Sequence, residues 1–191
     1  DYFGAIHEYN KAITLNPTFV KAYNQRGIAY YKLFDFKEAI ANFTKAISIQ
    51  EDYLDAYYNR ALVRGVLGDY YGAIRDYDKV VALDPLLKDA YLNRGIAKGN
   101  IGLQLDAVAD FNKVIELDPD YPDIYYNRGV AYHRAGKFKE SLTDFNTAIE
   151  RNPKLGEAYM NRGLVKDLIG DHNGACFDWS QAGELNEYGA Y

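Results

Sequence analysis

The sequence predicts an all-α fold, a solenoid in which antiparallel helix pairs stack one after another along the chain. First, one segment recurs every 34 residues through a chain of 191 residues. Second, each repeat contains two runs of apolar residues with helical spacing, separated by a short break. Third, proline follows Asn or Asp at most joints between repeats, where a helix should end. A unit this small buries a core only by stacking on its neighbours, so the repeat decides the fold class.

The recurring segment contains an aromatic residue, an asparagine or glutamine, and an arginine in fixed order. Its copies begin at Ala22, Ala56, Ala90, Ile124 and Ala158. When positions are counted from two residues before each copy, full repeats span residues 20–53, 54–87, 88–121, 122–155 and 156–189. Residues 1–19 match the second helix of a truncated repeat, so we expect a single array over 1–191 and a missing N-terminal part.

Each repeat is predicted to be a helical hairpin. Residues 1–15 should form a lone second helix, and every full repeat should have helices over positions 2–14 and 18–30. Glycine stands in the break at Gly68, Gly136 and Gly170, where it can take the left-handed conformation that ends a helix. The second helices should end at Asn16-Pro17, Asp84-Pro85, Asp118-Pro119 and Asn152-Pro153.

Small and aromatic residues recur at the positions where two helices would cross. Position 4 is tyrosine in all five repeats, and position 8 is Gly27, Ala61, Gly95, Gly129 and Gly163. Position 20 is Ala39, Ala73, Ala107, Ser141 and Ala175, and position 24 is Phe43, Tyr77, Phe111, Phe145 and Trp179. This pattern resembles the tetratricopeptide repeat over essentially the whole chain. The resemblance implies a right-handed superhelix with a concave inner groove. Position 11 departs from the expected tyrosine at Arg64, Lys98 and Lys166.

Arginine occupies position 7 in every repeat, where the family usually has leucine on a partly buried face. A buried guanidinium without a partner is costly, so a carboxylate should lie nearby. Position 23 of the second helix supplies Asp in four repeats and Asn42 in the first. We predict four ion pairs within hairpins: Arg60–Asp76, Arg94–Asp110, Arg128–Asp144 and Arg162–Asp178.

The candidate binding surface is the first-helix face formed by positions 2, 5, 6, 9, 12 and 13, which the resemblance places in the groove. Position 6 carries a column of carboxamides, which both donate and accept hydrogen bonds and can therefore bind the backbone of an extended peptide. Apolar residues beside the column could form side-chain pockets, and acidic residues at position 2 favour a ligand with basic residues. The candidate peptide-binding residues are Gln25, Asn59, Asn93, Asn127, Asn161, Tyr58, Tyr126, Leu62, Ile96 and Val130. Solvated carboxamides and apolar residues packed between repeats are the alternative interpretation of this face.

The leading functional hypothesis is a non-enzymatic scaffold that binds an extended or helical segment of another protein. The alternatives are a structural array that self-associates through its ends, and the recruiting arm of an enzyme whose catalytic domain lies outside this chain. The three histidines fall at different repeat positions, so no metal site, cofactor or catalytic group is expected. The lone Cys176, beside Ala175 and Phe177, is expected to be packed as a small apolar residue.

Charge and hydropathy exclude two further classes of partner. The formal net charge is −5 and no basic cluster occurs, which argues against nucleic acid. Charged residues interrupt every apolar run well before the roughly 20 residues that a membrane span needs, so membrane insertion is not expected.

Overall fold

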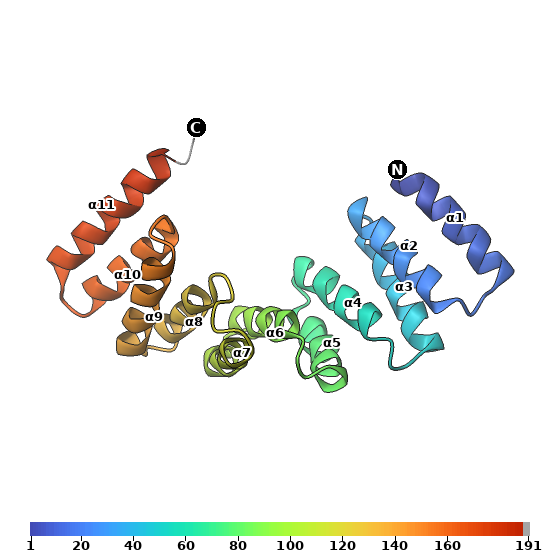
Figure 1. Ribbon diagram of the computed structural model, residues 1–191, viewed down its shortest axis with the longest axis horizontal. Coiled ribbons are helices and arrows are strands. Elements are labelled where there is room, and N and C mark those ends of the chain that lie inside the picture. Colours follow the sequence, from blue (N-terminus) through green and yellow to red (C-terminus); the bar gives the residue numbers. More distant parts are fainter. Residues whose placement is uncertain (189–191) are drawn as a thin grey trace. The chain divides into compact units, whose positions relative to one another are not determined.

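The computed structural model describes residues 1–188, which form eleven α-helices joined by short turns (Figure 1). The predicted all-α fold of sequential helix pairs is therefore confirmed. The chain divides into two compact units, residues 1–101 and 102–191. The first unit contains α1 (Tyr2–Leu15), α2 (Val20–Lys32), α3 (Phe36–Ile49), α4 (Leu54–Val66), α5 (Tyr70–Leu83) and α6 (Lys88–Asn100). The second contains α7 (Gln104–Leu117), α8 (Ile124–Arg134), α9 (Phe138–Arg151), α10 (Gly156–Leu168) and α11 (His172–Tyr188). The single array over 1–191 stays a prediction.

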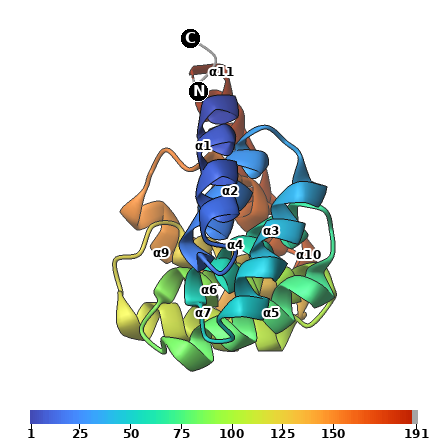
Figure 2. The ribbon, with the colours of Figure 1, turned by 90° about the vertical axis from the view of Figure 1, so that its right-hand side faces the viewer.

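Within each unit, the first helices of successive repeats form a row. Every helix packs against the next one along the chain inside its unit; α1, for example, lies beside α2 in both views (Figures 1 and 2). In addition, α2 contacts α4 and α4 contacts α6 in the first unit, and α8 contacts α10 in the second. The predicted binding residues all lie on these first helices.

The turns inside the hairpins have the conformation that the sequence predicts. Gly68, Gly136 and Gly170 have φ values of 76°, 72° and 88°. Phe34 takes the same place in the first full repeat at φ 60°, in the left-handed region that is unfavourable for a bulky residue. Asp69 follows one of these glycines and caps α5, because its side chain accepts a hydrogen bond from the backbone N–H of Gly72.

The small residue at position 8 brings the two helices of a hairpin together. A Cβ atom built on Gly27 would lie 2.6 Å from the Phe43 ring, and one on Gly129 would lie 2.8 Å from Phe145. The rings of Phe43 and Phe145 are buried against these glycines. Ser141, which replaces alanine at position 20, is satisfied because its hydroxyl donates to the carbonyl of Gly129 at 2.9 Å.

Three of the four predicted Arg–Asp pairs are present within their hairpins. Their guanidinium groups bind both carboxylate oxygens, at 2.9 and 2.7 Å for Arg60–Asp76, 2.7 and 2.7 Å for Arg128–Asp144, and 2.8 and 2.6 Å for Arg162–Asp178. The aspartates are buried, so this geometry satisfies charges that would otherwise be costly. The fourth pair, Arg94–Asp110, would join the two units and stays a prediction.

Each position-7 arginine also reaches back to the second helix of the preceding repeat. Its Nη1 donates to a side chain 16 residues earlier, and its guanidinium lies 5.3–5.6 Å from the ring of the position-4 tyrosine on its own helix. The pairs are Arg26–Asn10, Arg60–Thr44, Arg94–Asp78, Arg128–Asn112 and Arg162–Asn146, at 2.6–3.0 Å. The position-7 arginines therefore bind each full repeat to the second helix before it, and Arg60, Arg128 and Arg162 also close their own hairpins.

Candidate functional site

In the first unit, the position-6 asparagines contact position 5 of the preceding repeat. Asn59 Nδ2 donates to Asn24 Oδ1 at 3.1 Å, and Asn93 Nδ2 donates to the Tyr58 hydroxyl at 3.2 Å. Asn24 is buried, whereas Asn59, Tyr58 and Asn93 are half-buried. Each amide uses one hydrogen in this way. Within the described residues, the carboxamide oxygens of Asn59 and Asn93 accept no hydrogen bond.

The second unit repeats this arrangement once. Asn161 Nδ2 donates to the Tyr126 hydroxyl at 3.3 Å and to the backbone carbonyl of Glu157 at 2.8 Å. Asn127 and Val130 lie half-buried on α8, on either side of the buried Gly129. The structure thus brings Asn161 and Tyr126 together, whereas no described side-chain contact joins them to Asn127 or Val130.

An apolar pocket of about 220 Å³ lies between α2, α3 and α4. Its walls combine the predicted residues Asn59 and Leu62 with side chains from the preceding hairpin. The lining residues are Ile28, Tyr31, Lys32, Phe43, Asn59, Leu62 and Val63. Asn59 and Lys32 are therefore polar residues in the walls of a mainly apolar site.

A second pocket, of about 290 Å³, lies one repeat further along, between α4, α5 and α6. It is lined by Leu62, Gly65, Val66, Tyr70, Ala73, Tyr77, Asn93, Ile96, Ala97 and Asn100. Seven of these residues stand 34 positions after the seven that line the first pocket. Leu62 belongs to both pockets and forms the wall between them. The predicted residue Gln25 lines neither pocket and lies half-buried on α2.

Burial raises the pKa of two tyrosines at or beside the second pocket, Tyr77 and Tyr58. Burial raises the pKa of Tyr77 well above its usual range, and its ring meets that of Tyr58 edge-on at 5.9 Å. The pKa of Tyr58 is also raised, first by burial and then by the charge of Asp89, against the hydrogen bond from Asn93. The Tyr58 hydroxyl is therefore a neutral phenol at physiological pH, able to accept the hydrogen bond from Asn93.

At the equivalent positions of the second unit the surface is more polar. His133 and Arg134 stand where Tyr31 and Lys32 stand in the first unit. Burial lowers the pKa of His133, and the charge of Arg134 lowers it further, so this imidazole is neutral at pH 7. The apolar character of the pockets is therefore not repeated on α8.

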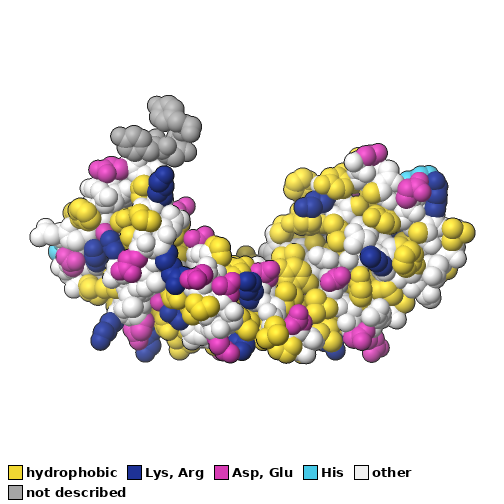
Figure 3. Space-filling view, in the orientation of Figure 1, with side chains coloured by type: hydrophobic (Ala, Val, Ile, Leu, Met, Phe, Trp, Pro, Cys, Tyr) yellow, Lys and Arg dark blue, Asp and Glu magenta, His cyan; other side chains and the backbone are white. Residues whose placement is uncertain are grey.

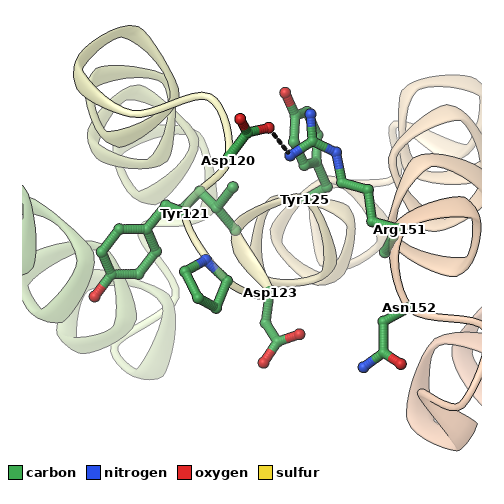
Figure 4. Close-up of a pocket in the computed structure, with 9 residues that line it drawn as sticks. Asp120, Tyr121, Asp123, Tyr125, Arg151 and Asn152 are labelled. Carbon is green, nitrogen blue, oxygen red and sulfur yellow. Dashed lines mark hydrogen bonds and ion pairs between the residues drawn. The ribbon is translucent and has the colours of Figure 1, made fainter.

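A larger cavity, of about 360 Å³, lies at the joint before α8 (Figure 4). There Asp123 has φ 54°, and Arg151 stands where other repeats have Ile49, Leu83 or Leu117. Arg151 stacks 4.6 Å from the Tyr125 ring and donates to Asp120 at 2.9 Å and to the carbonyl of Pro119 at 2.7 Å. These contacts pair the Arg151 and Asp120 charges with each other and hold the loop in place, so we assign the cavity to an irregular joint.

Sequence reasoning missed the pocket walls that come from second helices. Phe43 and Tyr77 were assigned to the hairpin core, yet each also lines a pocket, and Tyr70 enters from the start of α5. The pockets also contain first-helix residues that the list of candidates omitted, among them Tyr31 and Val66. These two residues could have been predicted, because positions 12 and 13 belong to the predicted binding face. Hydrophobic side chains cover much of the visible face of the first unit (Figure 3).

The expectation for Cys176 is wrong. Its side chain is exposed, because the buried small residue of α11 is its neighbour Ala175 and the helix turns the next position toward solvent. Phe177 is likewise 61% exposed. Apolar neighbours in the sequence therefore did not indicate burial here.

Residues 1–188 contain neither a candidate metal site nor a candidate membrane span. No cluster of three or more His, Cys, Asp or Glu side chains in this part of the chain has an arrangement that could hold a metal ion. None of the helices in the same range combines the length and the apolarity needed to cross a membrane.

The fold and the row of first helices define a helical repeat protein. Models of the tetratricopeptide repeat match residues 20–53, 122–155 and 54–85, and a further TPR repeat model matches residues 1–33 and 106–136. Together these matches cover well over half of the chain, which therefore belongs to the tetratricopeptide repeat family. A comparison with curated protein sequences found no match.

Several solved structures are similar in fold. A crystal structure of MamA is 24% identical with a TM-score of 0.82, over 86% of this chain and 96% of that one. Residues 41 to the end of MamA from Desulfovibrio magneticus RS-1 are 20% identical with a TM-score of 0.86, over 90% and 97%. YrrB, described as a TPR protein with an unusual peptide-binding site, is 19% identical with a TM-score of 0.82, over 93% and 91%.

Proteins of this family share a general function. Tetratricopeptide repeat proteins mediate protein–protein interaction, and the repeats are a scaffold that is usually not catalytic. Partners of this class are proteins or peptides.

Proposed function

We propose that this chain is a non-enzymatic scaffold that binds an extended segment of another protein along the exposed face of its first helices. The observation that carries the proposal is the pair of equivalent apolar pockets in the first unit, each with a position-6 asparagine in its wall. Apolar pockets with a few placed polar groups are the usual form of a ligand site. The usually non-catalytic character of the family supports the non-enzymatic part of the proposal.

The asparagines have the chemistry to bind a peptide backbone. Asn59 and Asn93 are each tied to the preceding repeat by one amide hydrogen, which fixes the orientation of the carboxamide. The remaining hydrogen and the oxygen can then donate to a peptide carbonyl and accept from a peptide N–H. A fixed carboxamide loses less conformational entropy when it binds, so the inter-repeat hydrogen bond favours binding as well as stability.

The similar fold of YrrB gives modest support, because that protein is described as having an unusual peptide-binding site. The likeness concerns the fold, and the site proposed for this chain is drawn from its own residues. The second unit has its own candidate contact residues, Asn127, Val130, Tyr126 and Asn161, with more polar chemistry. Gln25 and Ile96 complete the proposed surface in the first unit.

The proposal is tested with random dodecapeptides displayed on phage and selected against the whole chain. Selected sequences are synthesised with a fluorescent label, and their dissociation constants are measured by anisotropy. The double variant Asn59→Ala/Asn93→Ala should bind them at least tenfold more weakly, because it removes two backbone contacts. Urea unfolding of the same variant measures how much stability the change costs.

The matched control is Asn173→Ala, which removes an exposed carboxamide on α11 of the second unit and leaves Asn59 and Asn93 unchanged. It should lose less than threefold in affinity. A selection without any enriched peptide, or equal affinities of wild type and the double alanine variant, would contradict the proposal. That outcome would favour the alternative, a structural array that self-associates.

A further inference from the structure

The two pockets of the first unit repeat at the spacing of the first helices. α2 contacts α4, and α4 contacts α6, so neighbouring first helices are packed directly against each other. Packed helices have axes about 8–10 Å apart. Because the pockets occupy equivalent repeat positions, their centres are separated by about the same distance.

This spacing selects the conformation of an extended ligand. A polyproline II segment rises about 3.1 Å per residue with three residues per turn, so side chains three residues apart lie about 9 Å apart on one face. A β-strand places alternate side chains on one face, about 7 Å apart for two residues and about 13 Å for four, and neither distance matches. An α-helix matches with side chains seven residues apart, at about 10.5 Å.

The asparagines distinguish between the two ligand conformations that match the pocket spacing, the polyproline II segment and the α-helix. An α-helix has already paired the backbone groups of its middle turns, so it offers Asn59 and Asn93 no backbone partner. The backbone of a polyproline II segment has no internal hydrogen bonds. The protein presents one position-6 asparagine for each pocket, and a polyproline II turn presents one apolar side chain together with free carbonyl groups. The aromatic residues Tyr31, Tyr70 and Tyr77 in the walls suit such a segment, which typically docks on aromatic-lined grooves.

Charge beside the pockets favours a basic ligand. Asp55 is exposed at position 2 of α4, and the negative charge of Asp89 at position 2 of α6 reaches Tyr58 beside the second pocket. The acidic position 2 thus recurs with the pockets and lies near the N-terminus of each helix. Lys32 lines only the first pocket, near the opposite end of α2.

We infer that the first unit binds a polyproline II segment with apolar side chains three residues apart, one in each pocket, and a basic residue facing the acidic position-2 side chains. This inference rests on the proposed function and specifies its ligand. Leu62, the shared wall, contacts both apolar side chains.

Gly65 allows one pocket to be filled without disturbing the helix. It lines the second pocket only, and a Cβ atom built on it meets nothing within 4 Å. Gly65→Leu therefore places a side chain in that pocket while replacing a helical glycine, which also favours the helix. Gly183→Leu is the matched control, because Gly183 lies on α11 of the second unit and its added Cβ also meets nothing within 4 Å.

The probes are labelled nonapeptides with proline at positions two, four and eight and an N-terminal lysine. One has leucine at positions three and six, a second at three and five, a third at three and seven, and a fourth has a single leucine. A stapled helical peptide with leucines seven residues apart is the helical probe. In anisotropy titrations with the whole chain, the peptide with leucine at positions three and six (the three-and-six peptide) should bind at least tenfold more tightly than the other nonapeptides.

Gly65→Leu should remove the tenfold advantage of the three-and-six peptide and leave the affinity for the single-leucine peptide unchanged. Gly183→Leu should change neither of these two affinities. Equal affinities for all leucine spacings, or tightest binding of the helical peptide, would overturn the inference and leave the proposed peptide-binding function standing. An unchanged advantage in Gly65→Leu would overturn the assignment of the pockets. If no probe binds and the phage selection is also empty, the proposed function itself fails.

Discussion

The carboxylate of Asp178 is fully buried and binds two cations. Arg162 contacts both of its oxygens, and Lys166 Nζ lies 2.9 Å from Oδ2. Asp76 receives a second cation in the same way from Arg64, at 2.8 Å. Arg64 and Lys166, basic residues at position 11 that depart from the family pattern, therefore each supply a second cation to the position-23 carboxylate of their hairpin. In the first full repeat position 23 is Asn42, and position 11 there is the neutral Tyr30.

We expect Asp178→Asn to destabilise the fold by about 2–3 kcal/mol, because it leaves two partly buried cations without an anion. Urea unfolding followed by circular dichroism measures the change. The double variant Lys166→Tyr/Asp178→Asn copies the Tyr30 and Asn42 combination and should recover at least half of the loss. A double variant that is no more stable than the single one would contradict this explanation.

The same carboxylate gives a pH-dependent contribution to stability. Burial alone would raise the pKa of Asp178, but hydrogen bonds from Arg162 and Lys166 outweigh it and hold the pKa below its ordinary value. A carboxyl group with a lowered folded-state pKa stabilises the fold fully above its unfolded pKa of about 3.9, and this contribution is lost as pH falls through the folded value. The stability gap between wild type and Asp178→Asn should therefore be constant from pH 7 to 5 and shrink below about pH 4.

At the scale of helices, the crossing of α8 and α9 depends on the absence of a side chain at Gly129. An added Cβ would lie 2.8 and 2.9 Å from two atoms of the Phe145 ring and 3.3 Å from Asp144 Cβ. The ring is fully buried and has no space into which it can move. The second full repeat has Ala61 at this position, opposite Tyr77, so the helix crossing there accommodates a methyl group.

Gly129→Ala should therefore lower the free energy of unfolding by about 1–3 kcal/mol, despite the better helix propensity of alanine. Gly65→Ala is the matched control, since its added Cβ meets nothing within 4 Å, and it should raise stability by about 0.5–1 kcal/mol. Both values come from urea titrations of the whole chain. The same sign for both substitutions would show that helix propensity, and not the crossing distance, controls these positions.

The regular hairpins were predictable from the sequence because their signals are local. Turn glycines and Asx-Pro joints mark the helix ends, and the one-to-one match of arginine and aspartate predicted the ion pairs. The joint before α8 was not predictable in this way. Its left-handed Asp123, and the replacement of an apolar residue by Arg151, depend on contacts between a loop and a later helix. The pocket walls contributed by Phe43 and Tyr77 likewise need the packing of helices from two repeats.

At the scale of the whole molecule, acidic residues outnumber basic ones, and the formal net charge is −5. The 34-residue period places Asp or Glu at position 2 in four of the five full repeats, near the helix N-termini of the proposed surface. The period that gives the fold its core thus also repeats a negative charge near the candidate contact residues of four repeats, whereas the first full repeat has Lys21 at this position. A ligand with lysine or arginine should be drawn to this surface by a field that salt screens.

We expect the affinity for the nonapeptide with leucine at positions three and six to fall about three- to tenfold between 0.05 and 1 M NaCl. The reason is that the screening length drops from above 10 Å to about 3 Å over this range, which weakens the attraction of its N-terminal lysine. The same peptide with glutamine in place of lysine and an acetylated N-terminus should change less than twofold, because its contacts are apolar and hydrogen-bonded. Asp55→Asn should reduce the salt dependence of the lysine peptide, since Asp55 is an exposed acidic residue beside the pockets. Anisotropy titrations at four salt concentrations measure these slopes. Identical slopes for the two peptides would show that the acidic position-2 residues do not contact the ligand.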